Sequence, residues 1–307
     1  MTKVFIDGSA GTTGLKIFDL LAKRPDISLI KLPEELRKDP AARAEAINSA
    51  DIVFLCLPDA AAKEAVSFID NSNTAVIDTS TAHRTDDGWE YGFAELSDRR
   101  SRISNSKRIA NPGCHASGFL ALTEPLVKNG IISPDASLTC FSLTGYSGGG
   151  KKMIADYESE SRDPLLDSPR QYGLTQTHKH LPEMQKIAGL NASPIFCPIV
   201  ADFYCGMQVT VPLFGKDING GIEDIKKIYA EKYNSKIVHF DETDAEGGFL
   251  ATNLLAGRDD MSISVCGNDE RILLVARFDN LGKGASGAAI QNMNILLGVD
   301  ETTGLNV

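Results

Sequence analysis

The chain lacks an excess of positive charge. Its 307 residues hold 31 lysines and arginines against 41 aspartates and glutamates, which gives a net charge of −10. Broad binding to nucleic acid or to an anionic membrane needs basic surface, so the composition argues against both kinds of partner. An anionic small molecule would have to bind where lysine and arginine side chains cluster locally.

The chain also lacks paired cysteines and long apolar runs. Its six cysteines include no CxxC pair, which is typical of reduced thiols in a cytosolic protein. Met1-Thr2-Lys3 leads straight into a strand-like run, without a charged-then-apolar signal region. No apolar run approaches the roughly 18–20 residues of a membrane span. We therefore expect a cytoplasmic protein with no membrane partner.

The first residues have the order strand, glycine turn, helix. Lys3 to Asp7 reads as a buried strand, residues 8–14 have the spacing GxxGxxG, and apolar residues then recur at helical spacing. Glycine permits a tight turn and close approach of a pyrophosphate to the helix start, so we expect a dinucleotide here. The spacing is not the GxGxxG of many NAD-binding proteins, and a glycine turn without a ligand is the alternative. The residues expected to contact the dinucleotide are Gly8, Ser9, Gly11, Thr12, Thr13 and Gly14.

Strands and helices alternate through the region that follows. Strands are expected at 27–32, 51–58 and 75–78, with helical segments between them. This pattern predicts an α/β fold with a doubly wound parallel sheet, whose ligands bind beyond the carboxyl ends of the strands. Ser80 and Arg84 follow one such end, where Ser80 is a candidate for contacting the cofactor and Arg84 either holds an anion or is solvated.

Lys31 lies near the end of the expected second strand, where NAD-specific proteins often carry an acid. A cation there favours NADP, because its additional phosphate is negatively charged. A solvated surface lysine is the alternative.

Cys114 is the candidate nucleophile. Arg108 to Ala110 is a short strand, Pro112 biases Asn111 away from helical geometry, and Gly113 permits a sharp turn. Apolar residues at helical spacing follow, so the cysteine falls in the first turn of a helix, whose unpaired N–H groups and dipole favour a thiolate. Cysteines at such positions titrate at about 3.5–7.5 instead of about 8.5. The alternative is a small buried thiol that serves packing alone.

A second domain begins near residue 114. Longer strand-like runs follow it, at 137–143, 203–213, 261–265 and 272–278, and a small-residue helix is expected at 287–297. The domains expected are a dinucleotide-binding domain over 1–113, an α+β domain over 114–283, and a C-terminal segment, 284–307, that packs back on the first.

Two polar stretches in the second domain carry candidate residues. Residues 145–152 meet part of the P-loop pattern, but Lys152 stands where Ser or Thr should bind magnesium, so we expect a flexible glycine loop that presents Lys151 and Lys152 to an anion. His178 and His180 could ligate a metal, but no CxxC or HExxH partner accompanies them, and no metal site is expected. A histidine near a cysteine nucleophile would instead act as acid and base, since its pKa lies closest to working pH.

Four stretches together resemble one known family. The glycine loop, Asn111 to Gly118, Thr177 to Met184 and Asn280 to Ala289 are similar to N-acetyl-gamma-glutamyl-phosphate reductase in its shorter form, and the resemblance covers essentially the whole chain. It implies a Rossmann domain, a second domain that binds substrate and makes subunit contacts, and NADP(H) as cofactor. Where longer relatives have His-Arg-His, this chain has Lys179 in the middle, which puts any role for that arginine in doubt.

The resemblance also implies roles for individual residues. Cys114 would be the nucleophile and His180 the acid/base, with His178 as the alternative. The residues implied around the cofactor are Gly8, Gly11, Gly14, Gly284 and Asn292. The candidates for holding the substrate are Arg84, Asn111, Lys151 and Lys152.

The implied reaction is the reduction of N-acetyl-gamma-glutamyl phosphate, a small anionic acyl phosphate, through a thioester on Cys114 in arginine biosynthesis. A homodimer or homotetramer is implied as well. The alternatives are aspartate-semialdehyde dehydrogenase and a reductase of the one-carbon-longer acyl phosphate of lysine biosynthesis, since one methylene changes binding by only about 1–3 kcal/mol. A dinucleotide-binding sensor with a dead catalytic centre is the alternative from another class.

Overall fold

The computed structural model describes residues 1–242 and 246–307, and the chain divides into two compact units. The first unit comprises residues 1–94, 98–112 and 285–305, and the second comprises 95–97, 113–284 and 306–307. The divisions at 112/113 and 284/285 lie one residue from the boundaries expected at 113/114 and 283/284. Within the described ranges, no helix is long and apolar enough to cross a membrane.

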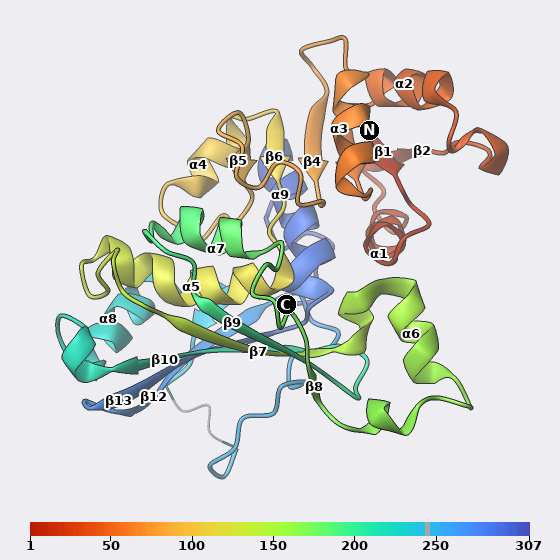
Figure 1. Ribbon diagram of the computed structural model, residues 1–307. Coiled ribbons are helices and arrows are strands. Elements are labelled where there is room, and N and C mark those ends of the chain that lie inside the picture. Colours follow the sequence, from red (N-terminus) through yellow and green to blue (C-terminus); the bar gives the residue numbers. More distant parts are fainter. Residues whose placement is uncertain (243–245) are drawn as a thin grey trace. The chain divides into compact units, whose positions relative to one another are not determined.

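The first unit is built on a six-stranded sheet in the order β2-β1-β3-β4-β6-β5, in which every pairing is parallel. Its strands are β1 (Thr2–Asp7), β2 (Ile27–Ile30), β3 (Ile52–Leu55), β4 (Ala75–Asp78), β5 (Glu90–Tyr91) and β6 (Arg108–Ala110). Its helices are α1 (Thr12–Leu21), α2 (Pro40–Ser49), α3 (Asp59–Ser67), α4 (Arg99–Ser104) and α9 (Gly287–Leu297) (Figure 1). The expected parallel α/β sheet is confirmed.

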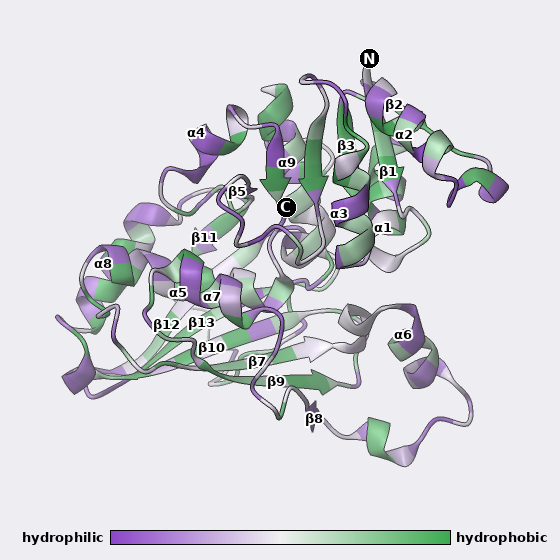
Figure 2. Ribbon diagram, turned by 45° about the horizontal axis from the view of Figure 1, so that its top comes forward, coloured by the Kyte–Doolittle hydropathy of each residue, from purple (hydrophilic) through white to green (hydrophobic). Residues whose placement is uncertain are grey.

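Strand β3 supplies a core on each face of this sheet. Ile52 and Phe54 pack into one apolar cluster, and Val53 and Leu55 pack into a second one. Successive residues of a strand point to opposite faces, so a strand buried on both faces must be apolar throughout. Figure 2 shows β3 and β4 in the hydrophobic colour, while α4 carries mostly hydrophilic residues.

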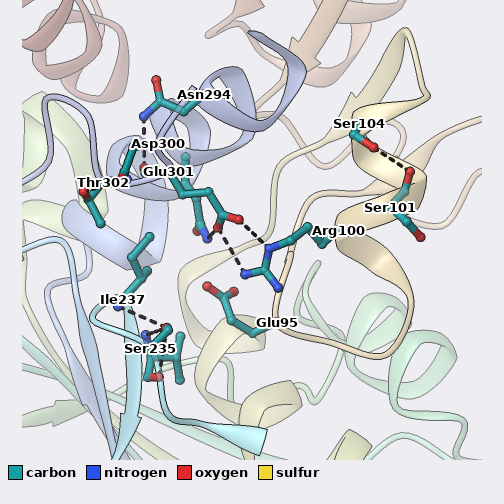
Figure 3. Close-up of polar contacts among 12 residues, drawn as sticks. Glu95, Arg100, Ser101, Ser104, Ser235, Ile237, Asn294, Asp300, Glu301 and Thr302 are labelled. Atoms are coloured by element: carbon teal, nitrogen blue, oxygen red, sulfur yellow. Dashed lines mark hydrogen bonds and ion pairs between the residues drawn. The ribbon is translucent and has the colours of Figure 1, made fainter. Parts of the chain in front are cut away.

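The C-terminal helix α9 belongs to the first unit. Its residues Ala289, Ile290 and Met293 are buried in the same cluster as Phe54. The turn after it is fixed by polar contacts, since Arg100 of α4 forms an ion pair with Glu301 and the Asn294 amide donates to the Glu301 carbonyl at 3.0 Å (Figure 3). The helix expected over 287–297 is confirmed with the same bounds.

The second unit contains a seven-stranded mixed sheet in the order β11-β12-β13-β10-β7-β9-β8. Its strands are β7 (Thr139–Gly145), β8 (Arg170–Gln171), β9 (Ile195–Ala201), β10 (Met207–Phe214), β11 (Val238–Phe240), β12 (Met261–Asn268) and β13 (Arg271–Phe278). Its helices are α5 (Cys114–Lys128), α6 (Gly150–Glu158), α7 (Leu181–Ala188) and α8 (Ile222–Lys232). The expected α+β character is confirmed.

Two local expectations for this unit were wrong. Residues 145–152 do not form an irregular loop, because a 3₁₀ turn at Tyr146–Gly149 leads directly into α6 at Gly150. Residues 203–206 precede β10 instead of beginning it. Strand β9 was not expected at all, because Pro198 interrupts its apolar run. The proline is tolerated there because β8 pairs with β9 over only two residues.

Helix α5 lies directly on one face of this sheet. A Cβ at Gly118 would stand 2.4 Å from a Val209 methyl group and 2.9 Å from the Phe278 ring, so only glycine permits this approach. The opposite face exposes large apolar side chains, since Phe141, Ile195 and Leu273 are 45%, 61% and 43% accessible. Figure 1 shows α5, α7 and α8 together on one side of the sheet.

Two tyrosines of the second unit hydrogen-bond to carbonyl groups of α5, one of which a proline leaves open. Pro125 lies inside α5 and has no N–H to give to Ala121, whose carbonyl instead accepts a 2.7 Å hydrogen bond from Tyr233. Tyr229 donates to the neighbouring Leu122 carbonyl, and burial raises the pKa of both phenols.

We expect Tyr233→Phe to lower the free energy of unfolding by about 1–3 kcal/mol, because a buried carbonyl loses its only donor. Urea unfolding measures this, and an unchanged midpoint would contradict it.

Candidate active site

Cys114 is the first residue of α5, as the sequence predicts. Strand β6 ends at Ala110, residues 111–113 make the turn, and Gly113 caps the helix without a side-chain hydrogen bond. The N–H groups of the first turn therefore have no side-chain acceptor at the cap, and the thiol is half-buried. The positive end of the helix dipole favours negative charge at this position.

A cluster of histidines surrounds the residue next to Cys114. The ring of His115, which is buried, lies 5.5 Å from that of His180 and 5.8 Å from that of His178, measured between centroids. The two latter rings are 4.7 Å apart, and His180 is the N-cap residue of α7. The fold thus brings both predicted histidines to the start of α5. No group of three or more His, Cys, Asp or Glu side chains within the described ranges is arranged to hold a metal ion.

Glu183 is a site residue that the sequence analysis missed. Its carboxylate, 1% exposed, accepts a 3.2 Å hydrogen bond from the Gly113 N–H and lies 3.9 Å from His180 Nε2. One carboxylate therefore joins the turn before Cys114 to the start of α7, and its charge stabilises an imidazolium at His180. The signal in the sequence was a carboxylate three residues after a histidine at a helix start, where the two side chains share a face.

Other cysteines lie in settings that keep them protonated. Burial raises the pKa of Cys56 to about 12, and burial also raises the pKa of Cys140. A thiol that stays protonated is a poor nucleophile. These two cysteines are therefore unsuited to the chemistry that Cys114 is placed to perform.

Gly284 packs against Cys114 within the second unit. A Cβ on this glycine would lie 3.0 Å from the Cys114 Cβ and 3.2 Å from the Phe278 ring. The preceding Lys283 is buried and forms a 2.8 Å ion pair with Glu95, which fixes the segment. The small size of Gly284 thus keeps space beside the nucleophile, and its contact with a cofactor stays a prediction.

The glycine loop of the first unit has the geometry that close approach of a phosphate requires. Gly8 has φ +87°, and a Cβ there would stand 2.3 Å from the Cys56 carbonyl oxygen. A Cβ at Gly14 would stand 2.5 Å from the Gly8 carbonyl oxygen. Gly11 caps α1 without a side-chain hydrogen bond, so the first N–H groups of the helix have no side-chain acceptor at the cap. These residues fit a dinucleotide pyrophosphate.

A cavity of about 940 Å³ adjoins this loop within the first unit. Gly8, Ser9 and the end of β2 line it, together with four basic residues, Lys31, Arg37, Lys38 and Arg43, and three acidic ones, Asp7, Glu34 and Glu35. Arg43 is buried and paired with Asp7 at 3.0 Å, and burial nevertheless raises the pKa of Asp7. Lys31 lies over the Phe18 ring at 4.8 Å, so it stands at the cavity, as an NADP site would require.

Asn292 lies in one hydrogen-bonded group with two other predicted residues, Asn111 and Arg84, at the ends of β4 and β6. Its buried amide donates to the Gly92 carbonyl at 2.8 Å and to Asn111 Oδ1 at 3.1 Å. Arg84 donates to the carbonyls of Asn111 and Thr79 at 2.9 and 3.0 Å. Among the described residues, Asn292 Oδ1 is buried without a hydrogen-bond donor, and its contact with a cofactor stays a prediction.

The remaining predicted residues lie outside these clusters. Ser80 donates to Asp78 at 2.8 Å in the first unit, and the same carboxylate holds His83 at 2.7 Å. Lys151 and Lys152 are exposed on the first turn of α6 in the second unit. Their roles as cofactor and substrate ligands stay predictions.

Comparison with known proteins covers both units. Residues 30–105 match the family described as "Semialdehyde dehydrogenase, NAD binding domain", and residues 114–280 match "Semialdehyde dehydrogenase, dimerisation domain". A protein of Nostoc sp. named N-acetyl-gamma-glutamyl-phosphate reductase 2 is 43% identical, with 99% of each chain covered. A protein of Mesorhizobium japonicum named N-acetyl-gamma-glutamyl-phosphate reductase is 45% identical, with 97% of this chain and 99% of the relative covered.

Solved structures show the same fold at much lower identity. Aspartate semialdehyde dehydrogenase II of Vibrio cholerae, in complex with ASA, is similar with a TM-score of 0.72 and 15% identity, covering 97% of this chain and 98% of that one. The Candida albicans aspartate semialdehyde dehydrogenase with NADP gives a TM-score of 0.69 at 17% identity, covering 97% and 98%. The chain therefore belongs to the semialdehyde dehydrogenase family, and its full-length relatives place it among the N-acetyl-gamma-glutamyl-phosphate reductases of that family.

Proposed function

We propose that this protein reduces N-acetyl-gamma-glutamyl phosphate to N-acetylglutamate semialdehyde and phosphate with NADPH, as a cytoplasmic enzyme of arginine biosynthesis. The observation that carries the proposal is Cys114 as the first residue of α5, with the rings of His178 and His180 near that of the adjacent His115, in a chain 43–45% identical to reductases of this name. Aspartate-semialdehyde dehydrogenases share the fold at only 14–17% identity. Their activity is therefore less favoured for this chain than that of the reductases.

In the first step, the Cys114 thiolate attacks the acyl carbon. The new C–S bond makes a tetrahedral oxyanion, and its collapse breaks the bond to the phosphate oxygen, which leaves with the electron pair. The N–H groups at the start of α5 would stabilise this oxyanion, an effect worth roughly 2.7–4 kcal/mol per donor. The product of this step is a thioester on Cys114.

In the second step, the thioester becomes the aldehyde. A bound NADPH would supply a hydride for the thioester carbon. His180 protonates the oxygen that forms and takes the proton back as the C–S bond breaks and the thiolate is restored. The Glu183 carboxylate, 3.9 Å from His180 Nε2, would stabilise the protonated ring before the first transfer and after the second. Arg84, Asn111, Lys151 and Lys152 are the proposed ligands of the anionic substrate.

The residues proposed to hold the cofactor are the glycine loop (Gly8, Ser9, Gly11, Thr12, Thr13 and Gly14), Ser80, Gly284 and Asn292. The lysines and arginines of the 940 Å³ cavity support NADP over NAD. Arg43 is already paired with Asp7 and Glu64, so Lys31, Arg37 and Lys38 are the cations proposed for the 2′-phosphate.

We expect the double variant Arg37→Ala/Lys38→Ala to raise KM for NADPH by about tenfold or more, since a hydrogen bond to a charged group contributes about 1.5–3 kcal/mol. KM for NADH should not change, because NADH lacks that phosphate. Steady-state kinetics with each cofactor measures the two KM values. Lys63→Ala, an exposed lysine of α3 outside the cavity lining, is the matched control. An equal rise for both cofactors would contradict the assignment.

We propose that the protein is a homodimer or homotetramer joined through the exposed face of the second unit's sheet. That face carries Phe141, Ile195 and Leu273, and contiguous exposed apolar residues mark interaction sites. We expect Ile195→Asp to convert the oligomer to monomers, because it would bury a charge without a partner. Light scattering measures the mass, and an unmodified protein that is monomeric would contradict the proposal.

The reaction is tested most simply in reverse. The protein is given NADP, phosphate and N-acetylglutamate semialdehyde, with aspartate semialdehyde and the one-carbon-longer acetylated aldehyde in parallel. We expect phosphate-dependent NADPH formation, fastest with N-acetylglutamate semialdehyde. Faster turnover of another aldehyde would identify that aldehyde as the substrate instead. No activity with any of the three would favour the alternative of a dinucleotide-binding sensor without catalytic activity.

A further inference from the structure

Two residues of the site, Tyr172 and Ser142, take no part in the steps above. Ser142 lies on β7, is fully buried, and is paired in register with Val209 on the face toward α5. Tyr172 follows β8 and is half-buried. His115 connects them, since its Nδ1 lies 2.7 Å from Ser142 Oγ and its Nε2 lies 2.7 Å from the Tyr172 hydroxyl oxygen.

His115 carries a single ring proton. Burial, followed by the nearby charge of His178, lowers the pKa of His115 to about 3, so the ring is neutral at any working pH. A neutral imidazole donates through one nitrogen and accepts through the other. The position of that proton decides whether Tyr172 must donate to His115 or is free to donate elsewhere.

The buried hydroxyl of Ser142 decides the position. Within the described ranges it makes no hydrogen bond except the one to His115, and no solvent reaches it. If Nδ1 carried the proton, the Ser142 O–H would be a buried donor without an acceptor, which folded proteins avoid. Ser142 therefore donates to Nδ1, and His115 Nε2–H donates to the Tyr172 oxygen. The Tyr172 proton is then directed away from His115.

Tyr172 lies within electrostatic reach of the nucleophile. Burial, and next the negative charge of Cys114, raise the pKa of Tyr172, so its phenol keeps its proton. Its ring is 6.1 Å from that of His178, within the same cluster. A phenol that is protonated and whose O–H is not used by His115 is a donor for negative charge that develops on the acyl oxygen bound at Cys114.

We propose that Tyr172 is a further catalytic residue, which donates its O–H to the oxyanion formed on Cys114, and that Ser142 and His115 are positioning residues that fix the direction of this donor. The proposal rests on the thioester chemistry proposed above. A donor that acts only on the oxyanion raises kcat without tightening substrate binding.

Kinetics tests the role of Tyr172. We expect Tyr172→Phe to lower kcat by about 10²-fold with KM nearly unchanged. Ser142→Ala should give a smaller fall, and this fall should vanish when Tyr172 is already Phe, since both act through one hydrogen bond. Tyr233→Phe and Thr123→Ala remove buried hydroxyls elsewhere along α5 and should leave kcat unchanged. An unchanged kcat in Tyr172→Phe would overturn the proposal. So would a double variant in which the effects of Tyr172→Phe and Ser142→Ala on kcat are independent.

The tautomer of His115 tests the positioning without any substrate. In the full chain labelled with ¹⁵N-histidine, the signals that disappear in His115→Gln identify this ring. We expect the proton on Nε2, and a proton on Nδ1 would overturn the inference. Failure of the proposed reductase activity would instead appear in the assay of the unmodified protein, so the two failures are distinguishable.

Discussion

Cys114→Ala is expected to lower kcat by at least about 10⁴-fold, because no other group of the site can form the thioester. The cofactor should bind as before, since the glycine loop and the adjoining cavity belong to the first unit. Stopped-flow or steady-state assays measure the rate, and fluorescence titration with NADPH measures the binding.

Cys266→Ala is the matched control for this prediction. Cys266 is a half-buried free thiol on β12 of the same unit, and it takes no part in the proposed steps. Its variant should retain full activity. A Cys114→Ala protein that keeps more than about one per cent of the rate would show that the reaction does not pass through this thiol.

His180→Asn is expected to lower kcat by about 10²–10⁴-fold, the range that a general acid and base contributes. His178→Asn should lower kcat by a much smaller factor. His180 is buried and lies 3.9 Å from the Glu183 carboxylate, whereas His178 is half-buried and accepts the backbone N–H of His180 at 3.2 Å. The fold therefore favours His180 for proton transfer and His178 for holding the loop.

The pH profile separates the two histidines. The variant that lacks the acid and base should lose a limb of the pH dependence of kcat, and the other variant should keep both limbs. Glu183→Gln should resemble a weakened His180→Asn, because the imidazolium loses its counter-charge. A larger loss in His178→Asn would exchange the roles of the two histidines.

Most of the first unit was predictable because local pattern determines it. The strands Ala75–Asp78 and Arg108–Ala110 and the helix Gly287–Leu297 have the expected bounds, since each is an apolar run of the right length between turn residues. Strand β9 was missed because its Pro198 removes one ladder donor, and only the short pairing with β8 shows why the sheet accepts it.

The site was predictable only where one segment contains it. The helix start at Cys114 follows from Pro112 and Gly113, whereas the meeting of that start with His180 depends on contacts between segments distant in the chain. Glu183 had a weak local signal in its spacing from His180. Tyr172 had none, because its place beside His115 is set by the pairing of β8 with β9.

The central claim, that Cys114 carries the acyl group, is tested most directly by mass spectrometry of the protein mixed with N-acetyl-gamma-glutamyl phosphate in the absence of NADPH. We expect one phosphate to be released per active site and one N-acetylglutamyl group to appear on the peptide that contains Cys114, with NADPH then removing it. Phosphate release without a modified protein, or an acyl group on any other residue, would contradict the account.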